Sequence, residues 1–294
     1  MKNIAAIGIF DGVHLGHKKI ISSAVRAARR IGSRSMVITF DPHPAKVIIP
    51  SRSVPSIMST RHRIASICGL GADRVCVIKF DRKFAALSPA GFARDVLVRR
   101  YRVSDVYVGG NFVFGKRNSG DCSALKELGE RYGFAVHVVP LIKVRGRTVS
   151  SSAIRGLIVK GRLDEASKML GRPVSVAGTV VGGKRRGRLL GYPTANIDPH
   201  HEAIPPGGVY AVWVRVKGKR YGGALFIGAP STFGEKDPVI EVHIFGFRDF
   251  IYKEDIEVVF VKRLRASRKF PDHRKLVEQI RRDDIQARKI LKLR

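Results

Sequence analysis

Two kinds of hydrophobic pattern divide the chain. In the first half, short apolar runs alternate with stretches of helical periodicity, and the runs lie at 4–10, 36–40, 75–80, 106–109 and 136–141. Between the first two runs, apolar residues recur at helical spacing with arginines between them: Ala24, Val25, Ala28 and Ile31. This alternation is typical of parallel strands joined by crossover helices, so we expect an α/β domain with a parallel sheet.

The second half has a different pattern. Its apolar runs, at 174–181, 209–216, 222–227, 239–245 and 256–261, are separated by turn residues, and no long helical period occurs before Pro271. We therefore expect a mainly β domain, an antiparallel barrel or sandwich that ends in a C-terminal helix. In that helix one apolar stripe is predicted, formed by Leu276, Ile280, Ala287 and Leu291.

The change of pattern falls near Gly171, after a short helical stretch. A chain of 294 residues is long enough for two domains, each with its own core. We expect the domains to be 1–171 and 172–294.

Charge is the unusual feature of the composition. The chain has 55 Lys and Arg against 24 Asp and Glu, a formal net charge of +31. Such a charge attracts anions, and a continuous basic face over 262–294 would suit a nucleic acid. The charges are, however, scattered through an ordinary core pattern, which favours a generally basic protein whose binding to nucleic acid is at most non-specific.

Cysteines and the first residues bear on the compartment. Cys68, Cys76 and Cys122 are odd in number and form no Cys-x-x-Cys pair, so the sequence predicts neither a disulfide framework nor a zinc site. The apolar run before Asp11 is too short for a secretory signal or a membrane span. We expect a cytoplasmic protein that does not contact a membrane.

Residues 10–17 read Phe-Asp-Gly-Val-His-Leu-Gly-His and follow the first predicted strand. A tight glycine turn before a helix N-terminus binds phosphate, because backbone N–H groups and the helix dipole point at the anion. His14 and His17 add imidazole donors, which can stabilise the charge that develops on the α-phosphate of ATP during nucleotidyl transfer. Metal-binding pairs on a helix favour a spacing of four residues, so the spacing of three favours phosphate.

Two further stretches of the first half carry candidate chemistry. Ser150 and Ser151 precede a predicted helix, and Arg155 lies one turn inside it, where it could neutralise a departing pyrophosphate. The alternative is a serine N-cap with a solvated arginine. Asp41 and His43 follow the second strand, at the edge where open sheets bind ligands, and a structural turn is an equal alternative for them.

In the second half, the stretch 178–188 contains glycines among cations and leads into Pro193-Thr194-Ala195-Asn196. Such a loop can form an anion nest, and Thr194 and Asn196 place two hard oxygens close together, which suits Mg-ATP. Glu241 and His243 share one face of the strand at 239–244. A carboxylate there can accept the proton of an attacking hydroxyl, although an exposed Glu on an alternating strand would show the same pattern.

Together these motifs resemble the bifunctional riboflavin kinase/FMN adenylyltransferase family, the prokaryotic FAD synthetases. Residues 10–17, 39–44, 108–116 and 149–155 are similar to its nucleotidyltransferase domain; 178–188, 193–196 and 241–243 are similar to riboflavin kinase. The resemblance covers nearly the whole chain in the family's order. It implies a Rossmann-like nucleotidyltransferase domain followed by a kinase barrel, which phosphorylates riboflavin to FMN and adenylylates FMN to FAD with release of pyrophosphate.

The resemblance also implies roles for individual residues and small molecules. The substrates and products are ATP, riboflavin, FMN and FAD, with Mg²⁺ bound with ATP by Thr194 and Asn196. The catalytic residues are His14, His17, Arg155 and Glu241. The residues that bind ATP are Gly8, Phe10, Asp11, Gly16, Ser150, Ser151, Gly182, Lys184, Gly187, Thr194 and Asn196. Asp41 and Asn111 contact flavin or substrate.

Some positions depart from the family pattern. An arginine that is common in the family is absent from 226–232, Gly246 replaces a common Asp, and 251–253 reads Ile-Tyr-Lys instead of Leu-Tyr-Gly. These positions belong to the flavin side of the kinase site. Two alternatives therefore stay open: an FMN adenylyltransferase whose kinase domain has lapsed, and a basic nucleic-acid-binding protein on an enzyme scaffold. A pantetheine-phosphate or nicotinate-nucleotide adenylyltransferase would leave the second domain without a role.

Overall fold

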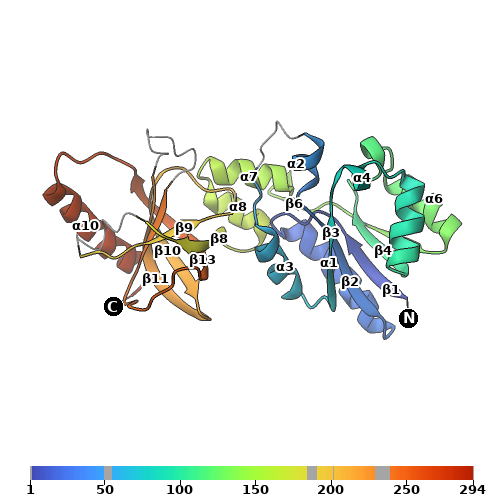
Figure 1. Cartoon of the computed structure of the whole chain (residues 1–294), viewed down its shortest axis with the longest axis horizontal. Coiled ribbons are helices and arrows are strands. Elements are labelled where there is room, and N and C mark those ends of the chain that lie inside the picture. The colour runs from blue at the N-terminus through green and yellow to red at the C-terminus, as the bar shows by residue number, and fades with distance from the viewer. Residues whose placement is uncertain (1, 50–54, 184–190, 201, 229–238, 294) are drawn as a thin grey trace. The chain divides into compact units, whose positions relative to one another are not determined.

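The computed structural model of the chain describes residues 2–49, 55–183, 191–200, 202–228 and 239–293. The chain forms two compact units (Figure 1). One unit comprises Met1–Ile154 with Met169–Gly171, and the other comprises Arg155–Lys168 with Arg172–Arg294. A domain boundary at residue 171 stays a prediction.

The first unit contains a five-stranded parallel sheet in the order β3-β2-β1-β4-β5 (Figure 1). Its strands are β1 (Asn3–Ile7), β2 (Arg34–Asp41), β3 (Arg74–Lys79), β4 (Val103–Gly109) and β5 (Ala135–Val139). The chain runs outward from β1 to β3 and then returns to the other side of β1 to form β4 and β5. The strand order therefore reverses between β1 and β4, and open α/β sheets bind ligands at the carboxyl ends of strands at such a point.

Helices connect the strands and cover both faces of the sheet. The longer ones are α1 (Leu15–Arg30), α3 (Thr60–Cys68), η1 (Phe92–Arg100) and α6 (Cys122–Tyr132); the short ones are α2 (Pro44–Ile48), α4 (Arg82–Ala85), α5 (Pro89–Gly91) and η2 (Lys116–Asn118). A small hairpin, β6 (Lys143–Val144) and β7 (Arg147–Thr148), follows β5. Residues of η1 and α6 pack on one face of the sheet with Ala5, Ile7 and Ile38. Alternate strand residues face the other way, which explains why these strands read as continuous apolar runs.

The parallel α/β fold is confirmed, with one error in the predicted core of α1. Ala24, Val25 and Ala28 are buried, but Ile31 is 60% exposed. The helix ends at Arg30, and Ile31 is its C-terminal cap. The helical period in the sequence therefore continues one position beyond the helix itself.

The second unit is a closed antiparallel barrel in the order β10-β11-β12-β9-β8-β13 (Figure 1). Its strands are β8 (Ser175–Val181), β9 (Ala195–Asp198), β10 (Gly208–Val216), β11 (Lys219–Ile227), β12 (Ile240–Ile244) and β13 (Asp255–Ala266). Two helices, α7 (Ser151–Val159) and α8 (Leu163–Leu170), precede it, and α10 (His273–Leu291) follows it. The predicted barrel with a C-terminal helix is confirmed, whereas the short polar strand β9 was not predicted.

The stripe on α10 is partly as predicted. Ala287 and Leu291 are buried in a cluster with Ala211 and Phe245 of the barrel, while Leu276 and Ile280 are half-buried. Asp283 is also buried on this side of the helix, and it pairs with Arg265 of β13 at 2.7 Å. The pattern of apolar and polar residues in the sequence could not predict this buried ion pair.

Two absences follow from the described residues. Cys68, Cys76 and Cys122 are all free in the structure. Within the described ranges, no helix combines the length and the apolar character that crossing a bilayer requires.

Candidate functional site

The loop between β1 and α1 has an unusual backbone. Phe10, Gly12 and Val13 have φ values of 53°, 84° and 40°, and Phe10 and Val13 are each only 1% exposed. Left-handed φ angles cost a non-glycine residue about 1–3 kcal/mol, and they persist where the surrounding packing leaves no alternative. A Cβ on Gly8 would lie 3.0 Å from the Phe10 ring, so glycine at this position leaves space for the ring.

His14 caps α1. Its Nδ1 accepts a hydrogen bond from the backbone N–H of His17 at 3.3 Å, and the residue is 5% exposed. Burial lowers the pKa of His14 to about 4, outweighing the opposing charge of Asp11. Because Nδ1 accepts, the proton of the neutral ring must sit on Nε2. At neutral pH, His14 therefore offers an Nε2–H donor.

His17 lies against His14. The two rings stack with centroids 3.5 Å apart and planes 19° apart, and Phe10 contacts His17 edge-on at 5.2 Å. Burial, and then the charges of His14 and Arg63, hold the pKa of His17 well below its ordinary value. Its Nδ1 is buried and makes no hydrogen bond within the described part of the chain. Residues 14–17 thus present two neutral imidazoles at a helix N-terminus.

Gly16 makes room for this arrangement, because a Cβ there would lie 3.2 Å from the His14 ring. Ser151 joins the same loop, since its hydroxyl donates to the carbonyl of Asp11 at 2.9 Å. Ser150 caps α7 by accepting from the N–H of Ala153 at 3.2 Å. Arg155 lies one turn beyond Ser151 in α7. The structure thus joins the loop 10–17 to Ser151 of the second predicted phosphate motif.

The carboxylate of Asp11 has a structural role, because it binds backbone groups. The side chain is 1% exposed, and Oδ1 accepts hydrogen bonds from the N–H groups of Ile57 at 2.8 Å and Met58 at 3.1 Å. It fixes the segment after β2 beside the β1–α1 loop.

The other predicted residues of this edge have local partners. Asp41 ends β2 and accepts from the Thr60 hydroxyl, and His43 caps α2 by accepting from the N–H of Ala45 at 3.1 Å. Asn111 is exposed in the turn after β4. These local contacts support a structural role in the turn for Asp41 and His43.

Sequence reasoning missed Arg63 on α3. It is 3% exposed, and its charge acts on His17. One arginine among 55 cationic residues gives no signal in the sequence, and only the fold shows that it is buried here.

The barrel brings the second set of residues together by strand register. Glu241 on β12 pairs with Asn196 on β9, and Asn196 pairs in turn with Val181 at the end of β8. Glu241 and His243 are half-buried, while Ile240, Val242 and Ile244 are buried, so the predicted shared face is confirmed.

Two contacts fix the Pro-Thr-Ala-Asn stretch. His243 Nδ1 donates to the carbonyl of Pro193 at 2.7 Å, immediately before Thr194. A Cβ on Gly183 would overlap the side-chain amide of Asn196, so the backbone of the glycine loop passes directly over this amide. One cluster is therefore formed by the start of the glycine loop, Asn196 and Glu241.

Some predicted positions lie outside the described residues, namely Lys184, Gly187 and the stretch 229–232. Gly182 is exposed at the end of β8. Gly246, which stands where the family commonly has Asp, has φ 67°, a value that glycine adopts at no steric cost. Nearby, Ile251 is buried, whereas Tyr252 is 46% exposed.

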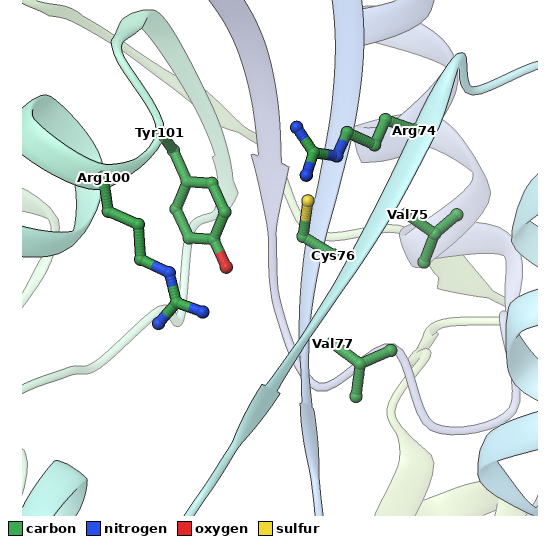
Figure 2. Close-up of a pocket in the computed structure, with 6 residues that line it drawn as sticks. All are labelled: Arg74, Val75, Cys76, Val77, Arg100 and Tyr101. Carbon is green, nitrogen blue, oxygen red and sulfur yellow. The ribbon is translucent and has the colours of Figure 1, made fainter.

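A pocket of about 360 Å³ lies elsewhere on the first unit (Figure 2). It is lined by Arg74, Val75, Cys76, Val77, Arg100 and Tyr101. These residues start β3 or precede β4, whereas His14 follows the carboxyl end of β1. Since the strands are parallel, the pocket and the histidines lie at opposite ends of the sheet, and no predicted site residue lines the pocket.

A parallel α/β unit with two histidines at a helix N-terminus, followed in the chain by a closed barrel with a carboxylate near a glycine loop, is the arrangement expected of a two-domain phosphotransferase. The FAD synthetase family model matches residues 1–153, and the riboflavin kinase model matches residues 170–291. The chain belongs to the bifunctional riboflavin kinase/FMN adenylyltransferase family, and it is a transferase.

Relatives cover nearly the full length. The bifunctional riboflavin kinase/FMN adenylyltransferase of Bacillus subtilis is 36% identical over 292 residues, 97% of this chain and 92% of the relative. The protein of that name from Buchnera aphidicola is 34% identical over 282 residues, 95% and 90% of the two chains. A crystal structure named macrolide-efflux protein, from Streptococcus pneumoniae, has a TM-score of 0.85 and 29% identity, covering 98% of this chain and 94% of that one.

Proposed function

We propose that this chain makes FAD from riboflavin in two ATP-dependent steps. The barrel phosphorylates riboflavin to FMN, and the α/β unit transfers an adenylyl group from a second ATP to FMN and releases pyrophosphate. Riboflavin, FMN and FAD as substrates and products follow from membership of the family. The observation that carries the adenylyl-transfer assignment is the stacked pair of neutral imidazoles, His14 and His17, at the N-terminus of α1.

In adenylyl transfer, a phosphate oxygen of FMN attacks the α-phosphorus of ATP, and the bond to the pyrophosphate oxygen breaks. Negative charge grows on the equatorial oxygens in the transition state. A neutral Nε2–H of His14, fixed by the cap at Nδ1, donates to that charge without any proton transfer. His17 supports the same oxygens, and Ser150, Ser151 and Arg155 hold the ATP phosphates.

The loop residues shape the ATP site around these donors. Gly8 and Phe10 set its backbone, Gly16 leaves space for the His14 ring, and Asp11 anchors the loop to the segment after β2. Asp41 and Asn111, at the carboxyl edge of the sheet, contact the flavin or the nucleotide.

In the kinase step, Glu241 accepts the proton of the ribityl 5′-hydroxyl while that oxygen attacks the γ-phosphorus of ATP and ADP leaves. Thr194 and Asn196 offer hydroxyl and amide oxygens of the kind that Mg²⁺ prefers, beneath a glycine backbone that comes close enough to cover phosphates. They would hold the ion, which neutralises phosphate charge when bound. Gly182, Lys184 and Gly187 belong to the loop that binds the ATP phosphates.

The partners of the chain in this account are small molecules: ATP, riboflavin and FMN. Binding to nucleic acid would be non-specific, and we place the enzyme in the cytoplasm.

Paired variants test the division of labour. The double variant His14→Ala/His17→Ala should lose FAD formation from FMN by at least about 100-fold, the cost of removing a transition-state donor, while it still converts riboflavin to FMN. Glu241→Ala should do the reverse. Chromatography of FMN and FAD after feeding riboflavin or FMN separates the two steps. Normal FAD synthesis by the double histidine variant would exclude the first assignment.

A further inference from the structure

Arg63 is a buried cation that none of the sequence motifs includes. Its Nη2 donates to the carbonyl of Phe40 at 2.8 Å and more weakly to the hydroxyl of Thr60 at 3.4 Å. Its Nε is buried and finds no acceptor among the described residues. A guanidinium has five N–H donors in a rigid fork, so this side chain is held at one end with donors to spare.

Arg63 binds the carbonyl of Phe40 near the carboxyl end of β2, the edge of the sheet at which His14 follows β1. Its charge is one of the causes that lower the pKa of His17. Burial lowers the pKa of the guanidinium itself, and the carboxylates of Asp11 and Asp41 oppose that effect. An arginine stays protonated at neutral pH even so. Arg63 therefore brings a fixed positive charge to the histidine pair.

The nearby carboxylates are engaged elsewhere. Asp11 Oδ1 accepts from two backbone N–H groups, and Asp41 Oδ1 accepts from the Thr60 hydroxyl. No ion pair of Arg63 is seen within the described ranges. A buried charge with unused donors is unfavourable unless a further partner completes it.

We propose that Arg63 is a phosphate-binding residue of the adenylyl-transfer site, whose unused N–H donors contact a phosphate oxygen of a substrate. This proposal rests on the proposed function. The guanidinium fork matches phosphate geometry, and a buried cation next to His17 stabilises the charge that gathers during the transfer. The phosphate belongs either to the ATP chain or to FMN, and the two sources are separated by experiment.

The test uses the full-length chain with Arg63→Gln, Arg63→Lys and the control Arg74→Gln, an exposed arginine at the amino end of β3. FAD formation from FMN is measured with ATP and FMN varied separately. Loss of a charged hydrogen bond predicts that Arg63→Gln raises the KM for one substrate about 10- to 100-fold. Arg63→Lys, which keeps the charge but loses the fork, should show a smaller increase. Arg74→Gln should match the wild type.

The substrate whose KM rises identifies the phosphate: ATP indicates the nucleotide chain, and FMN indicates the flavin phosphate. Riboflavin phosphorylation by the same variants should not change, which controls for enzyme concentration and folding. Both KM values within about twofold of wild type in a folded Arg63→Gln variant would overturn the proposal. The proposal would also be overturned if Arg63→Gln and Arg63→Lys lost kcat equally while neither KM changed selectively.

If Arg63→Gln does not fold, Arg63→Lys decides the matter by the same criterion. A selective rise in one KM supports the proposal, and unchanged values overturn it. A wild-type chain that makes no FAD from FMN would instead contradict the proposed function, so the two failures are distinguishable.

Discussion

Two neutral histidines are the main feature of the proposed adenylyl-transfer site. His14 is fixed as an Nε2–H donor because its Nδ1 caps α1, and burial keeps the ring uncharged. The motif alone indicated a phosphate site, but the tautomer and the stacking of the two rings depend on the left-handed backbone at Phe10 and Val13. The sequence predicted that the histidines and serines gather here, but it predicted neither the buried Arg63 nor how the ring nitrogens are used.

The depressed pKa of His14 predicts a dependence of stability on pH. The unfolded chain binds a proton near pH 6.5, and the folded chain binds it only near pH 4. Stability from this residue is therefore complete above pH 6.5 and is lost as the pH falls toward 4, by roughly 3 kcal/mol. In chemical denaturation, His14→Asn should keep the helix cap but lose less stability than wild type between pH 7 and 4. Parallel losses in both proteins would contradict the prediction.

A substitution of Gly183 tests the proposed kinase site. Its replacement by Ala would force the Asn196 amide out of place, because the new Cβ would overlap it. FMN formation from riboflavin should fall by at least about tenfold, while FAD formation from FMN persists. Gly182→Ala is the matched comparison, since a Cβ there meets nothing within 4 Å, and it should cost much less. Equal effects of the two variants would argue against this contact.

At the scale of elements, most of the fold could be predicted and the failures have physical reasons. The inner strands β1 and β2 are buried along nearly their whole length, and the barrel strand β12 alternates, so both kinds give a clear pattern. The strand β9 is short and carries Asn196 and Asp198, so its pairing with β8 and β12 has no hydrophobic signal. On α10, Asp283 is buried where an apolar residue would be expected.

The pair between Arg265 and Asp283 should hold α10 on the barrel. Arg265 binds both carboxylate oxygens, and Gln279 donates to the same group. Asp283→Ala leaves a largely buried arginine without its partner, so we expect the free energy of unfolding of the second unit to fall by about 3–5 kcal/mol. Glu278→Ala, which removes an exposed pair with Arg282 on the same helix, should cost about 1 kcal/mol or less. Urea unfolding of both variants tests this, and similar losses would refute it.

At the scale of the whole molecule, motif order carried the identification. Seven motifs follow one another in the order of the family, and relatives align over nearly the full chain. The net charge of +31 belongs to no single motif: the cations near the first site include Arg63, whereas Arg74 and Arg100 line a pocket at the other end of the sheet (Figure 2). Composition alone indicated a generally basic protein and gave no information about the reaction.

The central claim is that one chain carries out both phosphoryl and adenylyl transfer on the same flavin. The most direct measurement supplies riboflavin, Mg²⁺ and ATP labelled at either the α- or the γ-phosphorus, and follows the label into separated flavins. The account predicts γ-label in FMN, and both α- and γ-label in FAD. FAD formed only when FMN is supplied, or FAD that carries no α-label, would contradict it.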